Sequence, residues 1–464
     1  MSKTTQLDAE HHSDAEHHSD AERARLRRFV YLLIIVISAA YSAGRIASVR
    51  PLLSANDRSR WATVWSLVER GTYKLDEINK DRKWQTIDRV TLDGSLYSSK
   101  PPLLATIVAG IYWVTKQVTG LNLVDNTEAV TRIILYFVNL IPFVVSLVVL
   151  SKLLERYARS DVTRIFVLTT AAFGTFVSTF LVVLNNHTVA AVSVVFAIYP
   201  ALRIIADKQR RPLLFAIAGF FAGFACTNEL PAAMLGVALF VMLLREDAKS
   251  TLVYFVPAAI VPLAALVVTN YIAVGTWKPI YALFGSEAYT KNPDGTLTHW
   301  ANPKGIDKGG DSPLVYLFHC TLGHHGIFSL SPVFVLSVIA WLQIRRTSTP
   351  LRPLLWLGLG LTVAVLAFYL TRTNNYNYGG MTSGLRWAFW LIPFWLVALI
   401  PVCDHWADRR WFRNTAAALL LISAFSASYP FANPWQHPWL FRVLEEAKWI
   451  DYSSIEPNAG NHFA

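Results

Sequence analysis

Charged residues and cysteines are scarce in this chain of 464 residues. Only 16% of the residues are charged and 53% are hydrophobic, whereas soluble domains carry roughly 25% charged residues. This shortage of charge excludes a soluble enzyme, a soluble DNA-binding protein and a secreted disulfide scaffold. The three cysteines, Cys226, Cys320 and Cys403, follow no metal-binding or disulfide spacing. A single Cys226–Cys320 bridge stays open, because both residues are expected near the same membrane face.

The chain contains many long apolar runs. Runs of about 18–20 residues recur along the chain, and each is long enough to cross a bilayer as a helix. The sequence therefore predicts an all-α polytopic membrane protein, with about eleven transmembrane helices between residues 29 and 429. The expected spans are 29–48, 129–151, 165–184, 188–206, 212–227, 230–245, 251–274, 326–344, 354–371, 385–403 and 412–429.

The net charge of +11 comes largely from basic residues between these spans. Lys and Arg gather in the cytoplasmic loops of membrane proteins, so this charge requires no nucleic-acid partner. Basic residues between 23 and 28 precede the first span and place the N-terminus in the cytoplasm. Residues 1–28, which repeat the motif DAEHHS, are expected to form a disordered cytoplasmic tail. The other cytoplasmic loops are 152–164, 208–211, 245–249, 345–352 and 409–413.

One apolar segment, 101–118, does not fit this alternation. If it crossed the membrane, the basic loop 152–164 would lie outside, against the positive-inside rule. We therefore expect 101–118 to form a juxtamembrane helix at the outer face. That face then receives two long extracytoplasmic loops, 49–128 and 275–325, and a short tail, 430–464.

The first outer loop contains a carboxylate that has two interpretations. Apolar residues recur at helical spacing from Trp61 until Gly71, which predicts a short helix. Asp57 stands where the N-cap of this helix belongs, and a capping role alone would explain it. The same carboxylate, held at the membrane surface, could instead act as a general base.

Two cations stand beside helix ends on the same face. The pair Asp93-Gly94 predicts a hairpin turn. Lys100 follows it and precedes a proline-led helix, whose free backbone N–H groups suit a phosphate. Arg386 lies at the outer start of a span, and its forked donors also suit a phosphate. For both cations the alternative is a side chain that contacts lipid headgroups.

Further polar residues of the outer connections are candidates for a substrate pocket. His187 and Glu229 lie at span ends, where polar groups are costly unless they line a cavity or pair with one another. One His and one Glu alone do not indicate a metal site, although binding of a divalent ion remains an alternative. Glycines allow a backbone to approach a ligand closely. The remaining pocket candidates are His325, Tyr378, Gly379 and Gly380.

Taken in order, these motifs resemble those of the GT-C superfamily of membrane glycosyltransferases. The nearest members are the dolichyl-phosphate-mannose protein O-mannosyltransferases and the bacterial aminoarabinose transferases that modify lipid A. Their acidic pair with an Arg-aromatic-Ala stretch is matched by Asp57-Arg58-Ser59-Arg60-Trp61-Ala62. Their Lys-Pro and Gly-Gly…Gly-x-Arg motifs are matched by Lys100-Pro101 and by Gly379, Gly380, Gly384 and Arg386. Arg58 replaces the second acid of the usual pair, which weakens a metal-binding role for that pair.

The resemblance implies an enzyme that moves a sugar from a polyprenyl-phosphate-linked donor to an acceptor hydroxyl at the outer leaflet, with inversion. Asp57 would be the base, and Lys100, Arg386 and Arg60 would bind the donor phosphate. No cofactor is implied, and the partners are the lipid donor, membrane lipids and an unnamed acceptor. Such an enzyme lies in the cytoplasmic (inner) membrane with its active site on the extracytoplasmic face. The alternatives are a transporter or flippase of a lipid-linked saccharide, and a ligase or polymerase that uses a lipid-pyrophosphate oligosaccharide.

Overall fold

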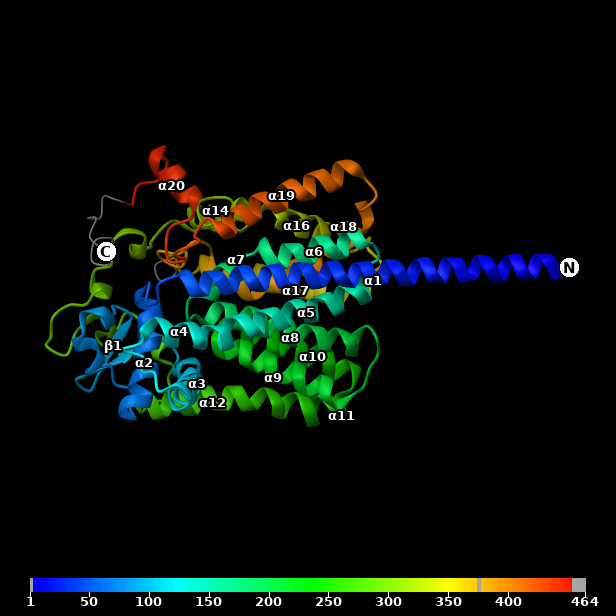
Figure 1. Ribbon diagram of the computed structural model, residues 1–464. Helices are drawn as coiled ribbons and strands as arrows, with labels where there is room; N and C mark the ends of the chain where they lie inside the picture. Colours follow the sequence, from blue (N-terminus) through cyan, green and yellow to red (C-terminus); the bar gives the residue numbers. More distant parts are fainter. Residues whose placement is uncertain (1–2, 374–376, 453–464) are drawn as a thin grey trace.

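Long helices run side by side through most of the chain (Figure 1). The computed structural model describes residues 3–373 and 377–452. Within them, seven helical stretches are long and apolar enough to cross a membrane, and two further apolar helices, Pro212–Asn228 and Pro332–Leu342, are shorter. The seven are Ala21–Ser48, Thr127–Tyr157, Asp161–Val182, Asn186–Ile205, Ala248–Val274, Arg352–Leu370 and Arg386–Trp406. The chain is therefore a helical membrane protein, and the expected number of about eleven spans stays a prediction.

The helices of the bundle are defined as follows. The first half contains α1 (Lys3–Ser48), α4 (Thr127–Leu135), α5 (Ile141–Tyr157), α6 (Asp161–Phe173), α7 (Phe176–Thr179), α8 (Asn186–Ile205) and α9 (Pro212–Asn228). The second half contains α10 (Ala233–Glu246), α11 (Ala248–Ser250), α12 (Val256–Val274), α16 (Val335–Leu342), α17 (Arg352–Leu370), α18 (Ile392–Trp406) and α19 (Arg410–Ser428). Helix α1 takes in the DAEHHS repeat, for which the sequence predicts disorder.

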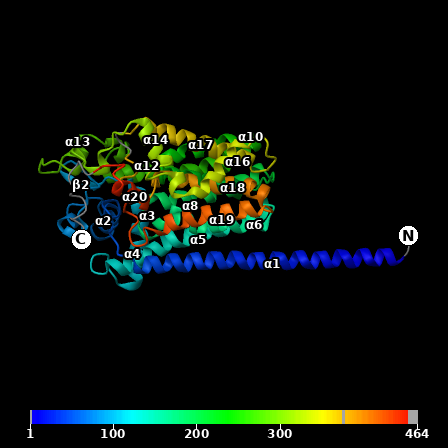
Figure 2. The same cartoon turned by 90° about the horizontal axis from the view of Figure 1, so that it is seen from above.

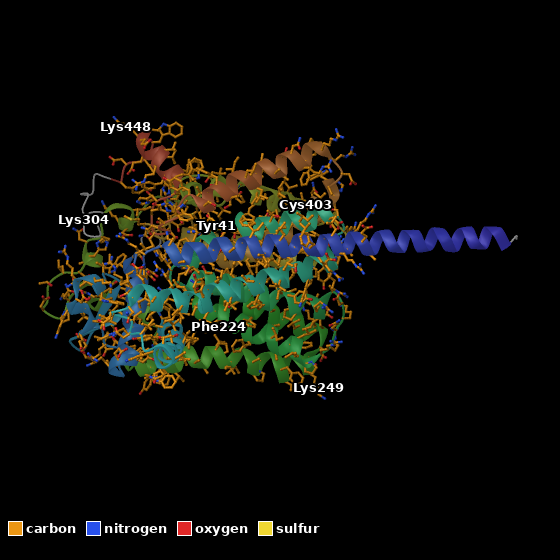
Figure 3. The ribbon with its side chains drawn as sticks, in the orientation of Figure 1. Tyr41, Phe224, Lys249, Lys304, Cys403 and Lys448 are labelled. Carbon is orange, nitrogen blue, oxygen red and sulfur yellow. The ribbon has the colours of Figure 1, made fainter. Side chains whose placement is uncertain are left out.

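The segments outside the bundle gather at one of its ends (Figures 1 and 2). The N-terminal part of α1 projects from the opposite end, and Figure 3 places Lys249 of the basic loop 245–249 at that opposite end, far from Lys304. Segments expected on one membrane face thus share one end of the molecule. These are α2 (Ala55–Arg70), β1 (Arg89–Leu92), β2 (Ser95–Ser98), α3 (Pro102–Thr119), α13 (Glu287–Thr290), α14 (Pro313–Thr321) and α20 (Trp439–Glu446). The short helix α15 (Ile327–Leu330) falls within the expected span 326–344.

Helix α2 begins one turn earlier than the sequence predicts. Its N-cap is Ser54, whose Oγ accepts a hydrogen bond from the backbone N–H of Asp57 at 3.1 Å. The interpretation of Asp57 as the N-cap is therefore wrong, because Asp57 lies inside the first helical turn. A Ser in extended conformation satisfies the free N–H groups at this place equally well. The helix ends at Gly71, whose φ of 63° is the left-handed conformation that glycine tolerates.

A hairpin joins two parts of the first loop. Strands β1 and β2 pair antiparallel, with Arg89 opposite Ser98, around a turn at Asp93-Gly94. Both turn residues have positive φ (49° and 72°), as a tight two-residue hairpin requires. Continuing this register by one residue places Asp88 beside Ser99, whose backbone N–H donates to the Asp88 carbonyl at 3.1 Å. The hairpin thus brings Asp88 next to Lys100.

Helix α3 occupies the segment 101–118 that the sequence predicts to be juxtamembrane. In Figure 1 the bundle helices run across the view, whereas α3 is seen almost end-on. It lies at the end where the segments outside the bundle gather, which we call the loop-rich end. Glu69 of α2 ties the two helices together, because it accepts hydrogen bonds from Tyr112 Oη and Lys116 Nζ, both at 2.6 Å. The α2–α3 pair forms a platform beside the hairpin.

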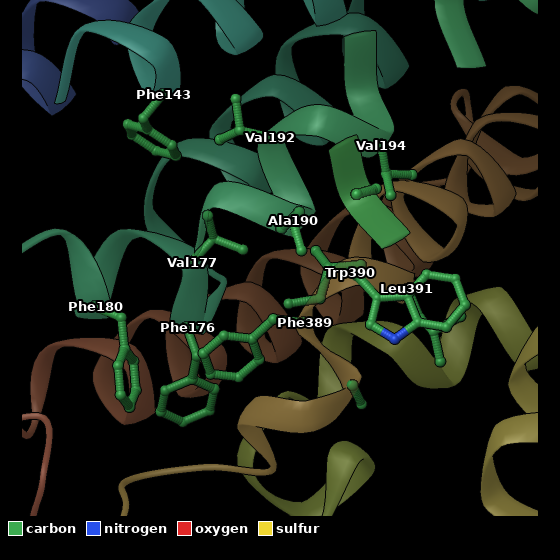
Figure 4. Close-up of a cluster of buried hydrophobic side chains, with 14 of the residues drawn as sticks. Phe143, Phe176, Val177, Phe180, Ala190, Val192, Val194, Phe389, Trp390 and Leu391 are labelled. Carbon is green, nitrogen blue, oxygen red and sulfur yellow. The ribbon is translucent and has the colours of Figure 1, made fainter. Parts of the chain in front are cut away.

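Aromatic and aliphatic side chains fill the bundle beneath this platform (Figure 4). Phe389 stacks on Phe176 and meets Phe180 edge to face, with ring centroids 6.2 Å and 5.3 Å apart. All three rings are buried, so they fix the segment that carries Arg386 against the first half of the bundle. The cysteines Cys226, Cys320 and Cys403 are buried and free. The structure therefore forms no Cys226–Cys320 bridge.

Candidate functional site

Three cations from distant parts of the sequence converge at the loop-rich end. Arg60 comes from α2, Lys100 follows β2, and Arg386 begins the 3₁₀ segment before α18. Burial lowers the pKa of Lys100, the Asp88 carboxylate raises it, and the nearby charges of Arg60 and Arg386 lower it further. The three residues are therefore close enough to repel one another, and we call them the cation cluster. Cations that repel each other provide a site for an anion.

Arg386 is held in place by a chain of hydrogen bonds. Its Nη1 lies 2.6 Å from His187 Nε2. Because a guanidinium can only donate, Nε2 accepts, and the imidazole proton is therefore assigned to Nδ1. Nδ1 donates in turn to Glu229 Oε1. The predicted pocket residues His187 and Glu229 thus meet at the cation cluster, although 42 residues separate them in sequence.

Gly379 holds the other edge of the same guanidinium. Its carbonyl accepts hydrogen bonds from Arg386 Nε at 3.1 Å and from Nη2 at 3.0 Å. Gly379 has a φ of +98°, and a Cβ there would lie 2.9 Å from Thr382 Cγ2 and 3.2 Å from Arg386 Nε. Glycine is needed for this close approach. Gly380 faces Asp307 instead, since a Cβ there would lie 2.8 Å from the Asp307 carboxylate.

A second branch of hydrogen bonds connects Arg60 to Glu229. Arg60 donates to the side-chain oxygens of Asn56 and Asn186. Asn186 Nδ2 donates to Glu229 Oε1 at 2.8 Å and to the Asn228 carbonyl at 2.7 Å. Burial raises the pKa of Glu229 to about 8, although the Arg386 and Arg60 charges act in the opposite direction. Glu229 therefore joins the two arginines through one carboxylate.

Asp57 lies on the same side of α2 as Arg60, three residues earlier. It is 1% exposed, and its Oδ1 accepts a hydrogen bond from the backbone N–H of Leu184 at 3.1 Å. Burial raises its pKa to about 6, against the effect of backbone N–H groups and of Arg60. A carboxyl group with this pKa is ionised near neutral pH and can accept a proton.

A hollow adjoins two members of the cation cluster. Its polar side includes Arg60, Lys100 and Ser98, and its apolar side includes Ala273 and Val274 from the end of α12. The stretch Ala248–Val274 includes α12, and only 17% of its most apolar part is buried inside the protein. Most of that part is therefore available to lipid. The hollow therefore combines cations with an apolar wall at the edge of the bundle.

Two predicted pocket residues lie elsewhere. The side chain of His325 contacts Thr382 O through Nε2 (2.9 Å) and His324 Nδ1 through Nδ1 (2.5 Å). Tyr378 stacks on His325, and its Oη donates to Asp311 at 2.5 Å. The structure does not bring these two side chains to the cation cluster. They belong to a group that we call the histidine cluster, formed by the buried residues His319, His324, His325 and Tyr378 and the half-buried residues His437 and Tyr452.

Sequence reasoning missed Asp88 and Asn186. Asp88 could have been found by counting outward from the Asp93-Gly94 turn, because that register places it opposite Ser99 and beside Lys100. No comparable local signal exists for Asn186, whose contacts come from α2 and α9. Among the side chains that the structure describes, those of residues 21–373 and 377–452, no group of three or more His, Cys, Asp or Glu residues could hold a metal ion.

No protein-family model and no curated protein matches the chain. Among solved structures, the chain is similar to the oligosaccharyltransferase of Archaeoglobus fulgidus in its apo form (13% identity) and in a complex with Zn and sulfate (14%). It is also similar to the archaeal oligosaccharyltransferase AglB from the same organism in complex with an inhibitory peptide and a dolichol-phosphate (15%). Each match has a TM-score of 0.46 and covers 87% of this chain. This chain spans little more than half of those chains (55%, 53% and 55%).

Proposed function

We propose that this protein is a membrane glycosyltransferase that moves a sugar from a polyprenyl-phosphate-linked donor to an acceptor hydroxyl. The observation that carries the proposal is the convergence of Arg60, Lys100 and Arg386 beside a buried carboxylate and an apolar hollow. A lipid phosphate needs both parts, since its phosphate requires cations and its chain requires an apolar wall. The reaction takes place at the outer leaflet of the cytoplasmic membrane, where the loop-rich end is expected.

The chemistry is a single displacement. The acceptor oxygen bonds to the anomeric carbon, the bond from that carbon to the phosphate oxygen breaks, and polyprenyl phosphate leaves with the electron pair. The acceptor proton passes to Asp57, and the configuration at the anomeric carbon inverts. The cation cluster stabilises the negative charge that grows on the departing phosphate. No step requires a cofactor.

The contacts of Arg386 support its role on the phosphate. His187 and Gly379 fix the guanidinium from two sides, so little side-chain entropy is lost when a ligand binds. Arg60 is fixed in the same way by Asn56 and Asn186. Cations that are held before the reaction stabilise developing charge without reorganisation.

The experiment that tests the proposal follows a polyprenyl monophosphate sugar, labelled in the sugar, in proteoliposomes that contain the purified protein and cell-derived acceptors. The wild-type protein should release polyprenyl phosphate and transfer the label, and the Asp93→Asn variant, changed at the exposed tip of the hairpin, should do the same. Asp57→Asn should bind the donor but transfer little label. Movement of intact donor between leaflets would identify a transporter instead. Consumption of only a lipid-pyrophosphate oligosaccharide would identify a ligase or polymerase.

A further inference from the structure

Asp88 faces the cation cluster from the base of the hairpin. Its Oδ2 lies 2.8 Å from Lys100 Nζ, and the side chains of the pair are only 10% and 21% exposed. The charge of Asp88 also acts on both arginines of the cluster. Asp88 thus contacts Lys100 directly and lies close enough to both arginines for its charge to act on them.

The backbone of Asp88 is fixed while its carboxylate has a single partner. The backbone N–H donates to Thr86 Oγ1 at 3.1 Å, and the carbonyl accepts from Ser59 Oγ at 2.6 Å. Among the described residues, Lys100 is the hydrogen-bond partner found for the carboxylate. The Asp57 carboxylate, in contrast, accepts a hydrogen bond from the Leu184 backbone. A carboxylate with one side-chain partner can be displaced by another anion without a change in the backbone.

We propose that Asp88 is an internal anion that occupies Lys100 in the empty site and exchanges with the lipid phosphate during the reaction. This inference rests on the proposed function, because it concerns the same phosphate site. A polyprenyl-phosphate sugar is a phosphodiester with one negative charge, so its exchange with Asp88 on Lys100 is nearly balanced in charge. The product is a phosphomonoester that carries up to two charges.

The exchange has a consequence for turnover. A dianionic product would bind strongly to three cations and leave slowly. Competition from the tethered Asp88 carboxylate weakens the hold of Lys100 on the product and promotes its release. Asp88 therefore tunes the affinity of the site for phosphate, in addition to the residues that bind the phosphate directly.

The test measures binding of farnesyl phosphate, a short isoprenyl phosphomonoester, to the full-length protein in detergent micelles. Asp88→Asn should bind this ligand about tenfold more tightly than the wild-type protein, because a charged hydrogen bond no longer competes for Lys100. Asp93→Asn removes the same charge at the exposed tip of the hairpin without touching Lys100, so its affinity should stay within about twofold of wild type. The gain should vanish when Asp88→Asn is combined with Lys100→Ala, and farnesol should bind all variants equally.

Thermal unfolding provides a second measurement should Asp88→Asn be unstable when empty. Lys100 then lacks its anion, and farnesyl phosphate should raise the unfolding temperature of this variant more than that of the wild-type protein. If wild-type protein binds farnesyl phosphate while Asp88→Asn binds it no more tightly and gains no more stability, the exchange is overturned and the phosphate site remains. If the wild-type protein does not distinguish farnesyl phosphate from farnesol, both the exchange and the proposed function fail.

Discussion

Two buried polar groups lie at the loop-rich end, and they differ in the kind of charge they contain. The cation cluster combines Arg60, Lys100 and Arg386 with the carboxyl groups of Asp57, Asp88 and Glu229. The histidine cluster consists of aromatic rings that pack against one another, mostly edge to face. Burial lowers the pKa of His324 and His325 far below the usual range, which keeps both imidazoles neutral. The first group is able to bind an anion, and the second is typical of a packed interior.

The two groups also contain histidines for which the sequence predicts the same role. His187 and His325 are both buried histidines from outer connections, and both were expected in the pocket. His187 lies between a guanidinium and a carboxylate, whereas His325 lies between another histidine and a backbone carbonyl. The partners of a buried histidine, rather than its burial, therefore indicate whether it belongs to a reactive site.

The largest expected effect is the loss of sugar transfer when Asp57, beside the cation cluster, is changed. Asp57→Asn keeps a side-chain oxygen for the Leu184 N–H but cannot hold the acceptor proton. Sugar transfer should fall about 10²-fold or more, whereas donor binding and the unfolding temperature should stay close to wild type. Single-turnover kinetics with labelled donor would check this. Normal transfer by Asp57→Asn would move the search for the base to Glu229 and Asp88.

The next effect concerns the cations. Arg386→Ala and Lys100→Ala should each weaken donor binding or turnover about tenfold to a hundredfold, the worth of one charged hydrogen bond. Arg386→Lys should recover only part of the loss, because a point charge cannot replace contacts on two edges of the guanidinium. Donor titrations on purified variants would measure this. Full activity of either alanine variant at normal expression would make that residue a lipid-headgroup contact.

The pH dependence should follow the Asp57 carboxyl group. Because burial raises its pKa to about 6, the base loses its proton only as the pH rises through that value. The kcat/KM for transfer should therefore fall about tenfold for each pH unit below about 6. A profile without this acid limb would contradict Asp57 as the base.

Changes in the histidine cluster should affect stability instead of turnover. His325→Ala leaves the Thr382 carbonyl and His324 Nδ1 without their partner. The free energy of unfolding should fall by about 1–3 kcal/mol, as expected for buried polar groups left unsatisfied. The activity per folded molecule should change little. Thermal unfolding combined with donor binding would test both statements, and loss of donor affinity at full stability would return His325 to the site.

The smallest effect tests the cap of α2. Ser54→Ala removes the side-chain oxygen that accepts the Asp57 N–H, so the protein should lose about 1 kcal/mol of stability. Turnover should remain near wild type, because the Asp57 carboxylate keeps its own contact with Leu184. A large loss of turnover in Ser54→Ala would show that the start of α2 also controls the position of the base.

Local patterns were sufficient for much of the fold. The helical spacing after Trp61 and the glycine at position 71 predicted α2, and Asp93-Gly94 predicted the hairpin turn. The prolines after Lys100 predicted the start of α3. Each of these features depends on neighbours within a few residues. Ser54 was missed as the cap because Asp57 has the same capping chemistry and stands only three residues later.

The sequence by itself determined that the chain forms apolar helices joined by polar segments, because hydrophobicity and turn chemistry act over one or two helical turns. Only the tertiary structure decided which polar groups meet. Arg386 reaches His187 across 199 positions, and His187 reaches Glu229 across 42. Those contacts depend on how each helix is rotated and how far it extends against its neighbours. That arrangement is set by the packing of side chains such as Phe176, Phe180 and Phe389, and it leaves no local signature in the sequence.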